Sequence, residues 1–316
     1  MELIGLNDKL DSTKKSIVTV GNFDGVHCGH RILIEELVKR AEKENKRSVL
    51  ITFEPHTREV LFPDLPSNLL TTFPEKKILV EMLKVDYLLR IPFDKEFSEK
   101  TPEEFIDEIL ISKLHASDWI MGEGHSIGKN RSGGRKFLHD GMSKYHINIF
   151  TANLKRMGAE TVSSTQIRKH IIKGRVAEAV EMLGHPYLIS AQRIQGLKVG
   201  SKLGFPTLNF KRPPSQKVLP PSGVYAAELE FSGNVIQGAL YFGECPTFTQ
   251  RDVHFEFHAF DMNGFEPQTG SNASIWVYRF IRGNQFFSVE DKLVEQIKKD
   301  IIDIKKFFLE EKQTWR

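Results

Sequence analysis

The segment at residues 21–30, which reads Gly-Asn-Phe-Asp-Gly-Val-His-Cys-Gly-His, has the composition of a phosphate-binding loop. Its glycines let the backbone approach a polyphosphate closely, and His27 and His30 are spaced so that both can face the ligand. This suits displacement at the α-phosphate of a nucleotide, where positioned donors stabilise the phosphoryl oxygens as pyrophosphate leaves. The alternative is a glycine-rich turn with two incidental histidines, but the position between a strand pattern and a helix pattern favours the phosphate site.

A second segment combines hydroxyl groups with an arginine. Residues 162–168 read Val-Ser-Ser-Thr-Gln-Ile-Arg, and the pattern predicts a helix over 164–172. Hydroxyls at the start of a helix, with Arg168 one turn further on, can clamp a phosphate. The same residues could serve only as a helix cap, but their combination with the first segment favours the clamp.

A third segment, at residues 196–209, spaces its glycines at four-residue intervals and ends in Pro-Thr-x-Asn. Such a loop can wrap phosphates, although its spacing fits no Walker loop. Thr207 and Asn209 place two neutral oxygens on one side of a strand, and Mg²⁺ held jointly with ATP accepts few protein ligands of this kind. A purely structural glycine-rich hairpin is the alternative.

A carboxylate further along the chain could act as a base. Residues 253–260 alternate, so Glu256 and His258 share one face of a strand while Phe255 and Phe257 share the other. Glu256 could accept a proton from a substrate hydroxyl that attacks a γ-phosphate. By default, however, a glutamate on a polar strand face is simply solvated.

The first half of the chain alternates strand and helix patterns. A β-branched run at 16–20, a helix ending near residue 45 and an apolar run at 48–53 form a βαβ unit, which is typical of a parallel sheet covered by helices. Further helices are predicted at 75–83 and 102–110, and strands at 87–91 and 119–121. This half is predicted to be an α/β domain that places the 21–30 loop at the carboxyl end of a strand.

The pattern changes near residues 184–186. From there to about residue 279, short alternating segments such as 224–229 dominate, with many glycines and prolines, and they predict a small antiparallel sandwich or barrel. Residues 289–312 return to helical periodicity. We therefore predict two domains, 1–184 and 185–316, the second closed by a C-terminal helix.

Composition excludes several classes of protein. Of 316 residues, 40% are hydrophobic and 27% charged, as in a globular protein, and no run is long and apolar enough to span a membrane. The net charge of +3 is too balanced for a nucleic-acid-binding surface. Two cysteines, Cys28 and Cys245, and no recognisable secretion signal favour the reducing cytoplasm; Cys28 is expected to be a small buried residue rather than a redox centre.

The motifs together resemble the bacterial bifunctional riboflavin kinase/FAD synthetases. Gly-x-Phe-Asp-Gly-x-His-x-Gly-His resembles the family's nucleotidylyltransferase signature, and the segments at 52–56, 70–72, 75–77 and 162–168 are similar to motifs that follow it. The glycine-rich loop, the Pro-Thr-x-Asn motif and residues 220–226 resemble the riboflavin kinase half. The resemblance implies a Rossmann-like nucleotidylyltransferase domain with a parallel sheet, followed by a small antiparallel β-barrel.

The resemblance also implies roles for individual residues. Catalysis would fall to His27 and His30 in adenylyl transfer and to Glu256 in the kinase reaction, with Thr207 and Asn209 binding Mg²⁺. Residues implied to bind ATP or flavin are Gly21, Asn22, Phe23, Asp24, Gly25, Gly29, Ser163, Ser164, Thr165, Arg168, Gly200, Lys202, Gly204 and Arg282.

Four positions depart from the family pattern. Gly124 replaces residues that are usually polar or aromatic, and Gln166 stands where arginine is usual. In the barrel half, Tyr241 and Cys245 lie in a segment where the family has Asn-Ile-Gly-x-Arg-Pro-Thr.

The leading hypothesis is an enzyme that uses ATP to convert riboflavin to FMN and then FMN to FAD. Because of the four departures, an enzyme that keeps one activity and a flavin- or nucleotide-binding regulatory protein stay open as alternatives. The small molecules are the expected partners, without nucleic acid or membrane, and the sequence leaves the oligomeric state open.

Overall fold

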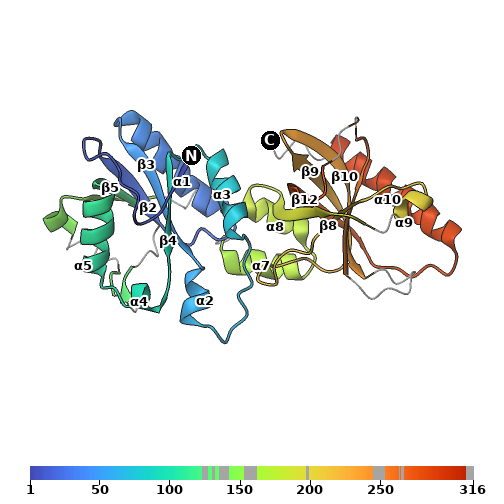
Figure 1. Ribbon diagram of the computed structural model, residues 1–316, viewed down its shortest axis with the longest axis horizontal. Coiled ribbons are helices and arrows are strands. Elements are labelled where there is room, and N and C mark those ends of the chain that lie inside the picture. Colours follow the sequence, from blue (N-terminus) through green and yellow to red (C-terminus); the bar gives the residue numbers. More distant parts are fainter. Residues whose placement is uncertain are drawn as a thin grey trace. The chain divides into compact units, whose positions relative to one another are not determined.

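The computed structural model describes residues 1–122, 127–129, 132–134, 142–152, 162–196, 199–244, 253–262, 264 and 267–310 (Figure 1). The chain forms two compact units. The first comprises Met1–Ser67 and Lys76–Ser163, and the second comprises Asn68–Glu75 and Ser164–Arg316.

The first unit is built on a parallel sheet of six strands in the order β1-β4-β3-β2-β5-β6. The strands are β1 (Glu2–Ile4), β2 (Ser16–Val20), β3 (Arg47–Glu54), β4 (Tyr87–Pro92), β5 (Ala116–Met121) and β6 (Asn148–Thr151). Every residue of β2 is buried, as expected of a strand covered on both faces. The chain runs outward in one direction from β2 to β4 and in the other from β5 to β6. The carboxyl end of β2 is therefore a topological switch point, where ligands of such sheets bind.

Helices connect these strands. They are α1 (Cys28–Lys43), α2 (Thr57–Leu61), α3 (Phe73–Met82), α4 (Lys95–Ser98), α5 (Pro102–Phe105) with a π-helical continuation over Ile106–Lys113, and a 3₁₀ turn at Met142–Tyr145. Helix α3 begins in the second unit and continues into the first. The predicted strand at 16–20 and the helices near 32–45, 75–83 and 102–110 are confirmed, with shifts of a few residues at their ends.

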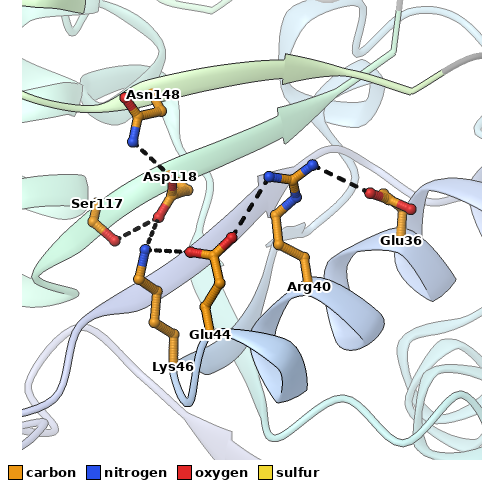
Figure 2. Close-up of polar contacts among 7 residues, drawn as sticks. All are labelled: Glu36, Arg40, Glu44, Lys46, Ser117, Asp118 and Asn148. Atoms are coloured by element: carbon orange, nitrogen blue, oxygen red, sulfur yellow. Dashed lines mark hydrogen bonds and ion pairs between the residues drawn. The ribbon is translucent and has the colours of Figure 1, made fainter.

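A network of charged side chains holds α1 against the sheet (Figure 2). The Asp118 carboxylate, 2% exposed, accepts hydrogen bonds from Lys46 Nζ at 2.5 Å and Asn148 Nδ2 at 2.9 Å. Burial opposes ionisation, but these bonds keep the pKa of Asp118 below its usual value. Lys46 also contacts Glu44, which pairs with Arg40 along α1 at 3.6 Å. The network fixes the C-terminal part of α1, so the opposite end of the helix, which carries the histidines, is positioned by the same rigid element.

The second unit contains a closed antiparallel barrel in the order β10-β11-β8-β7-β12-β9. Its strands are β7 (Tyr187–Ile194), β8 (Leu208–Phe210), β9 (Gly223–Phe231), β10 (Asn234–Glu244), β11 (Val253–Ala259) and β12 (Asn272–Gly283). Helix α10 (Glu290–Glu310) packs on β9, β10 and β12, where Phe308 lies edge-on to Tyr278 at 5.5 Å. The predicted fold, a parallel sheet followed by an antiparallel barrel with a closing helix, is confirmed.

Three shorter helices complete the second unit: α7 (Ser164–Ile172), α8 (Val176–Leu183) and α9 (Val199–Lys202). Helix α7 has the predicted bounds. Helix α8 was not predicted, although its buried Val176, Ala179, Val180 and Leu183 follow helical spacing. No helix in the described ranges is long and apolar enough to cross a membrane.

A segment from the first half of the sequence pairs within the second unit. The Leu69 amide donates to Gln216 O at 2.7 Å, and the Val218 amide donates to Leu69 O at 2.8 Å. Beside this bridge, Lys217 forms an ion pair with Glu75 at 2.8 Å, and both side chains are at most 1% exposed. Residues 68–75 therefore form part of the second unit, with Leu69, Leu70 and Glu75 buried in it.

Candidate active sites

The 21–30 loop brings the two predicted histidines into contact. His27 is the N-cap of α1, and its Nδ1 accepts a hydrogen bond from the His30 amide at 3.4 Å. The two rings stack with centroids 3.7 Å apart and an interplanar angle of 16°. The pair thus lies at the N-terminus of α1, where the helix dipole and unpaired amides favour a negatively charged group.

The backbone of this loop is held in an unusual conformation. Phe23, Gly25 and Val26 have positive φ angles of 47°, 83° and 40°. Left-handed φ is unfavourable for a β-branched residue such as Val26, so packing must stabilise it. Phe23 and Val26 are 3% and 1% exposed, and the Phe23 ring lies edge-on to His30 at 5.2 Å. Burial of these apolar side chains therefore shapes the loop that presents the histidines.

The remaining loop residues implied by the resemblance lie on the same segment as this pair. Gly21 follows β2, and a Cβ there would approach the Phe23 ring to 3.2 Å. Asn22 Nδ2 donates to Thr57 Oγ1 at 2.9 Å, which connects the loop to the start of α2. Asp24 is buried, and a Cβ at Gly29 would lie 3.3 Å from the His27 ring.

Cys28 lies inside the histidine motif and is partly buried. Burial raises the pKa of its thiol, so the group is protonated at neutral pH and a poor nucleophile.

The electrostatics of the pair favour a ligand. His30 Nδ1 is buried and has no hydrogen-bond partner among the described residues. Burial, followed by the neighbouring His27 and Lys76, holds the pKa of His30 well below its usual value, so its ring is neutral at pH 7. An unpaired buried ring nitrogen is costly unless a ligand or water satisfies it.

Lys76 is a buried residue near this loop for which the sequence motifs predict no role. It is 2% exposed, and its Nζ donates to Thr52 Oγ1 at 3.0 Å. Its sequence position contained a signal, because Lys76 shares helical spacing with the buried residues Leu79 and Val80 and so lies on the buried face of α3.

The predicted hydroxyl clamp is divided between the units. Ser163 ends the first unit, whereas Ser164 and Thr165 begin α7 in the second. Arg168 Nε donates to Asn68 O at 2.7 Å within the second unit. The joint action of these groups with His27 stays a prediction.

The barrel brings the predicted base and the predicted metal ligands together. Thr207 Oγ1 donates to Glu256 Oε2 at 2.9 Å. Across β8 and β11, Asn209 is the register partner of Glu256, and His258 Nδ1 donates to Pro206 O at 2.9 Å. One carboxylate, one hydroxyl and one amide therefore form a cluster of hard oxygen donors, which is the donor set that Mg²⁺ accepts.

The glycine-rich loop packs against this cluster. A Cβ at Gly196 would lie 2.1 Å from Asn209 Nδ2, and a Cβ at Gly200 would lie 2.4 Å from Phe205 O. These two positions therefore admit only glycine without displacement of a neighbour. Lys202 is exposed at the end of α9, and Gly204 follows with a positive φ of 85°.

Arg282 forms a bidentate ion pair within the second unit. Its guanidinium donates to both carboxylate oxygens of Asp300, from Nε at 2.9 Å and from Nη2 at 2.7 Å. Gln296 Nε2 also donates to Asp300, at 2.9 Å. These bonds join the end of β12 to α10, and a contact between Arg282 and flavin stays a prediction.

Two of the four positions that depart from the family pattern lie within the described residues. Gln166 lies in the first turn of α7, and Tyr241 pairs in register with Glu256. Gly124 and Cys245 lie outside the described residues.

A histidine pair at a helix N-terminus on a parallel sheet, followed by a cluster of oxygen donors on a β-barrel, is the arrangement expected of a transferase of phosphorus-containing groups. Comparison with known proteins defines the family. The family model for FAD synthetase matches residues 9–166, and the model for riboflavin kinase matches residues 183–308. The chain belongs to the bifunctional riboflavin kinase/FMN adenylyltransferase family, and the predicted resemblance is confirmed.

Relatives match over almost the whole chain. Bifunctional riboflavin kinase/FMN adenylyltransferases from Buchnera aphidicola subsp. Schizaphis graminum, Bacillus subtilis and Escherichia coli K12 are 35%, 32% and 31% identical. The alignments cover 98%, 93% and 92% of this chain and 99%, 93% and 92% of the relatives. A crystal structure titled macrolide-efflux protein, from Streptococcus pneumoniae, superposes with a TM-score of 0.78 at 25% identity, covering 96% of this chain and 99% of its own.

Proposed function

We propose that residues 185–316 transfer the γ-phosphate of ATP to riboflavin, giving FMN, and that residues 1–184 transfer AMP from a second ATP to FMN, giving FAD and pyrophosphate. The observation that supports this most strongly is the presence of two separate clusters, Thr207 with Glu256 and His27 with His30, in different compact units. Each cluster lies within the match to a different family.

In the kinase reaction, Glu256 accepts the proton of the ribityl 5′-hydroxyl as its oxygen attacks the γ-phosphorus. The bond from the γ-phosphorus to the bridging oxygen breaks, and ADP leaves. Thr207 donates to Glu256 in the structure, which orients the carboxylate. The close approach of Gly200 to Phe205 O supports the proposal that this loop presents its backbone, and with it Lys202, to the phosphates of ATP.

Thr207 and Asn209 would hold Mg²⁺ in this site, together with phosphate oxygens. The cation would neutralise charge on the β- and γ-phosphates, as in other kinases. Asn209 Nδ2 donates to Thr207 O at 3.5 Å, so its Oδ1 is the amide atom suited to a metal.

In adenylyl transfer, a phosphate oxygen of FMN attacks the α-phosphorus of ATP and the bond to pyrophosphate breaks. No covalent intermediate with the protein is required. His27, His30 and the amides at the start of α1 stabilise the phosphoryl oxygens, while Ser164, Thr165 and Arg168 bind the phosphate chain.

We further propose that the protein acts in the cytoplasm with small-molecule substrates. The two cysteines and the even balance of 44 basic and 41 acidic residues support this proposal and argue against a nucleic-acid partner.

The test is to incubate the purified chain with riboflavin, ATP and Mg²⁺ and to separate riboflavin, FMN and FAD by chromatography over time. FMN followed by FAD is the expected result. If FMN accumulates without FAD, only the kinase activity is present. If added FMN becomes FAD but riboflavin is not converted, only the adenylyltransferase activity is present. Binding of riboflavin or FMN without turnover would favour the regulatory alternative.

Variants assign each reaction to its site. Glu256→Gln is expected to slow FMN formation by about 10²- to 10⁴-fold, the usual contribution of a general base, without affecting FAD formation from FMN. His27→Asn is expected to have the reverse pattern. The exposed residues Glu290 and His146 provide matched controls, Glu290→Gln and His146→Asn, which should leave both rates unchanged.

A further inference from the structure

Two buried lysines of this chain have very different surroundings. Lys217 Nζ uses all three of its hydrogens, on Glu75 Oε2 at 2.8 Å, Leu70 O at 2.6 Å and Leu188 O at 2.7 Å. Lys76 Nζ makes one hydrogen bond, to Thr52 Oγ1 at 3.0 Å, and no ion pair within the described part of the chain. An ammonium group buried with two unused donors is costly, because its desolvation is not offset by a direct ion pair.

The surroundings of Lys76 indicate where a counter-charge would bind. Thr52 Oγ1, which accepts the Lys76 hydrogen bond, itself donates to Asn22 O at 3.3 Å, so Lys76 borders the 21–30 loop that carries His30. Its charge also contributes to the lowered pKa of the His30 ring. Burial in turn lowers the pKa of Lys76, although the carboxylates of Asp24 and Glu54 oppose this shift. His30 Nδ1 is itself buried without a partner among the described residues. Two unsatisfied polar groups therefore lie in the same region, beside the N-terminus of α1.

We infer that Lys76 is a further catalytic residue of adenylyl transfer, whose ammonium group contacts the phosphate chain of ATP and stabilises the charge that develops as pyrophosphate leaves. The inference rests on the proposed function of the first unit. It explains why a lysine lies in the protein interior without an ion pair, since the triphosphate supplies a direct ionic partner. It also gives α3 a chemical role at this site.

The first test compares Lys76→Met with Lys77→Met. Lys77 is the next residue on α3 and is only partly buried, so the control removes the same charge from the same helix. Lys76→Met is expected to lower kcat/KM for FAD formation from FMN by about 10²- to 10³-fold, the range found when one oxyanion-stabilising donor is removed. Lys77→Met should change this rate by less than about threefold, and both variants should form FMN from riboflavin at the wild-type rate.

A second readout distinguishes catalysis from a structural role. Because Lys76 is buried without an ion pair, its replacement by methionine should not destabilise the first unit. The β2 amides of Lys76→Met should therefore exchange no faster than those of the wild type, despite the loss of activity. Lys76→Arg should recover part of the rate, because it retains a positive charge.

The outcomes separate this inference from the proposed function. Normal FAD formation by a folded Lys76→Met variant would overturn the inference. So would faster exchange of the β2 amides in Lys76→Met, combined with equal losses of the FAD-forming rate in Lys76→Met and Lys77→Met. If the wild type itself makes no FAD, the proposed function fails. Calorimetry with pyrophosphate then decides the role of Lys76: tight binding to the wild type that Lys76→Met loses would support an anion-binding role, and equal binding would refute it.

Discussion

Replacement of Lys217 by methionine should destabilise the second unit strongly, because Lys217 and its ion-pair partner Glu75 are both buried. The ion pair between Lys217 and Glu75 is at most 1% exposed, and the ammonium also lies 4.2 Å from the centre of the Tyr187 ring. Methionine fills a similar volume but leaves the Glu75 carboxylate without a cation. The carbonyls of Leu70 and Leu188 each also lose the hydrogen bond from Lys217.

The expected cost can be estimated from this geometry. Removal of one partner of a buried ion pair costs about 3–5 kcal/mol, because the other charge stays desolvated. Glu75 keeps two donors, the Ser190 amide at 2.8 Å and the Thr72 amide at 2.7 Å, which argues for the lower part of that range. A cost of about 3 kcal/mol corresponds to a roughly 10²-fold increase in the opening equilibrium, since about 1.4 kcal/mol is a factor of ten.

Hydrogen exchange of the β9 amides measures this change in the intact chain, because β9 lies between β10 and β12 in the barrel. Lys211→Met, at an exposed position, is the matched control and should exchange like the wild type. The double variant Glu75→Gln with Lys217→Met removes both charges and should regain about 1–3 kcal/mol of the loss. Wild-type exchange in Lys217→Met, or a double variant less stable than Lys217→Met, would refute the argument that an unpaired buried charge dominates the cost.

Two further predictions concern the two sites. Gly200→Ala should reduce FMN formation by about tenfold or more while FAD formation from FMN is retained, because the new Cβ would lie 2.4 Å from Phe205 O and must displace the loop. Gly283→Ala, where a Cβ meets no atom within 4 Å, is the control, and equal kinase rates in the two variants would contradict the prediction. Acidification below about pH 6.5 should destabilise the first unit through His30. The pKa of the His30 side chain is lower in the folded than in the unfolded chain, so the unfolded chain binds the proton more readily. His30→Gln should therefore flatten the pH dependence of β2 exchange between pH 7.5 and 5.5, and an unchanged dependence would contradict it.

Much of the fold could be predicted from local sequence patterns. The run at 16–20 is β-branched and the helix at 164–172 is amphipathic, and both elements have the predicted bounds in the structure. The position of His27 at a helix N-terminus was also predictable, because a strand pattern ends at residue 20 and a helix pattern follows within a few residues. Such features depend on neighbours in sequence, so the sequence alone determines them.

The contacts between distant residues needed the tertiary structure. Thr207 and Glu256 are 49 positions apart, and they meet only because β8 pairs with β11 in that register. Leu69 bonds to residues near Lys217 because residues 68–75 fold into the second unit, which no periodicity in either segment indicates.

Residues 75 and 76 show most clearly what the sequence determines and what the tertiary structure decides. The sequence shows an acidic and a basic residue side by side at the start of a helix, a pattern that is usually solvated. In the structure both are buried, Glu75 with Lys217 as its partner and Lys76 with Thr52. The sequence determined that a helix carries these charges, but only the packing of other segments around that helix decided that one charge is neutralised and the other is left for a ligand.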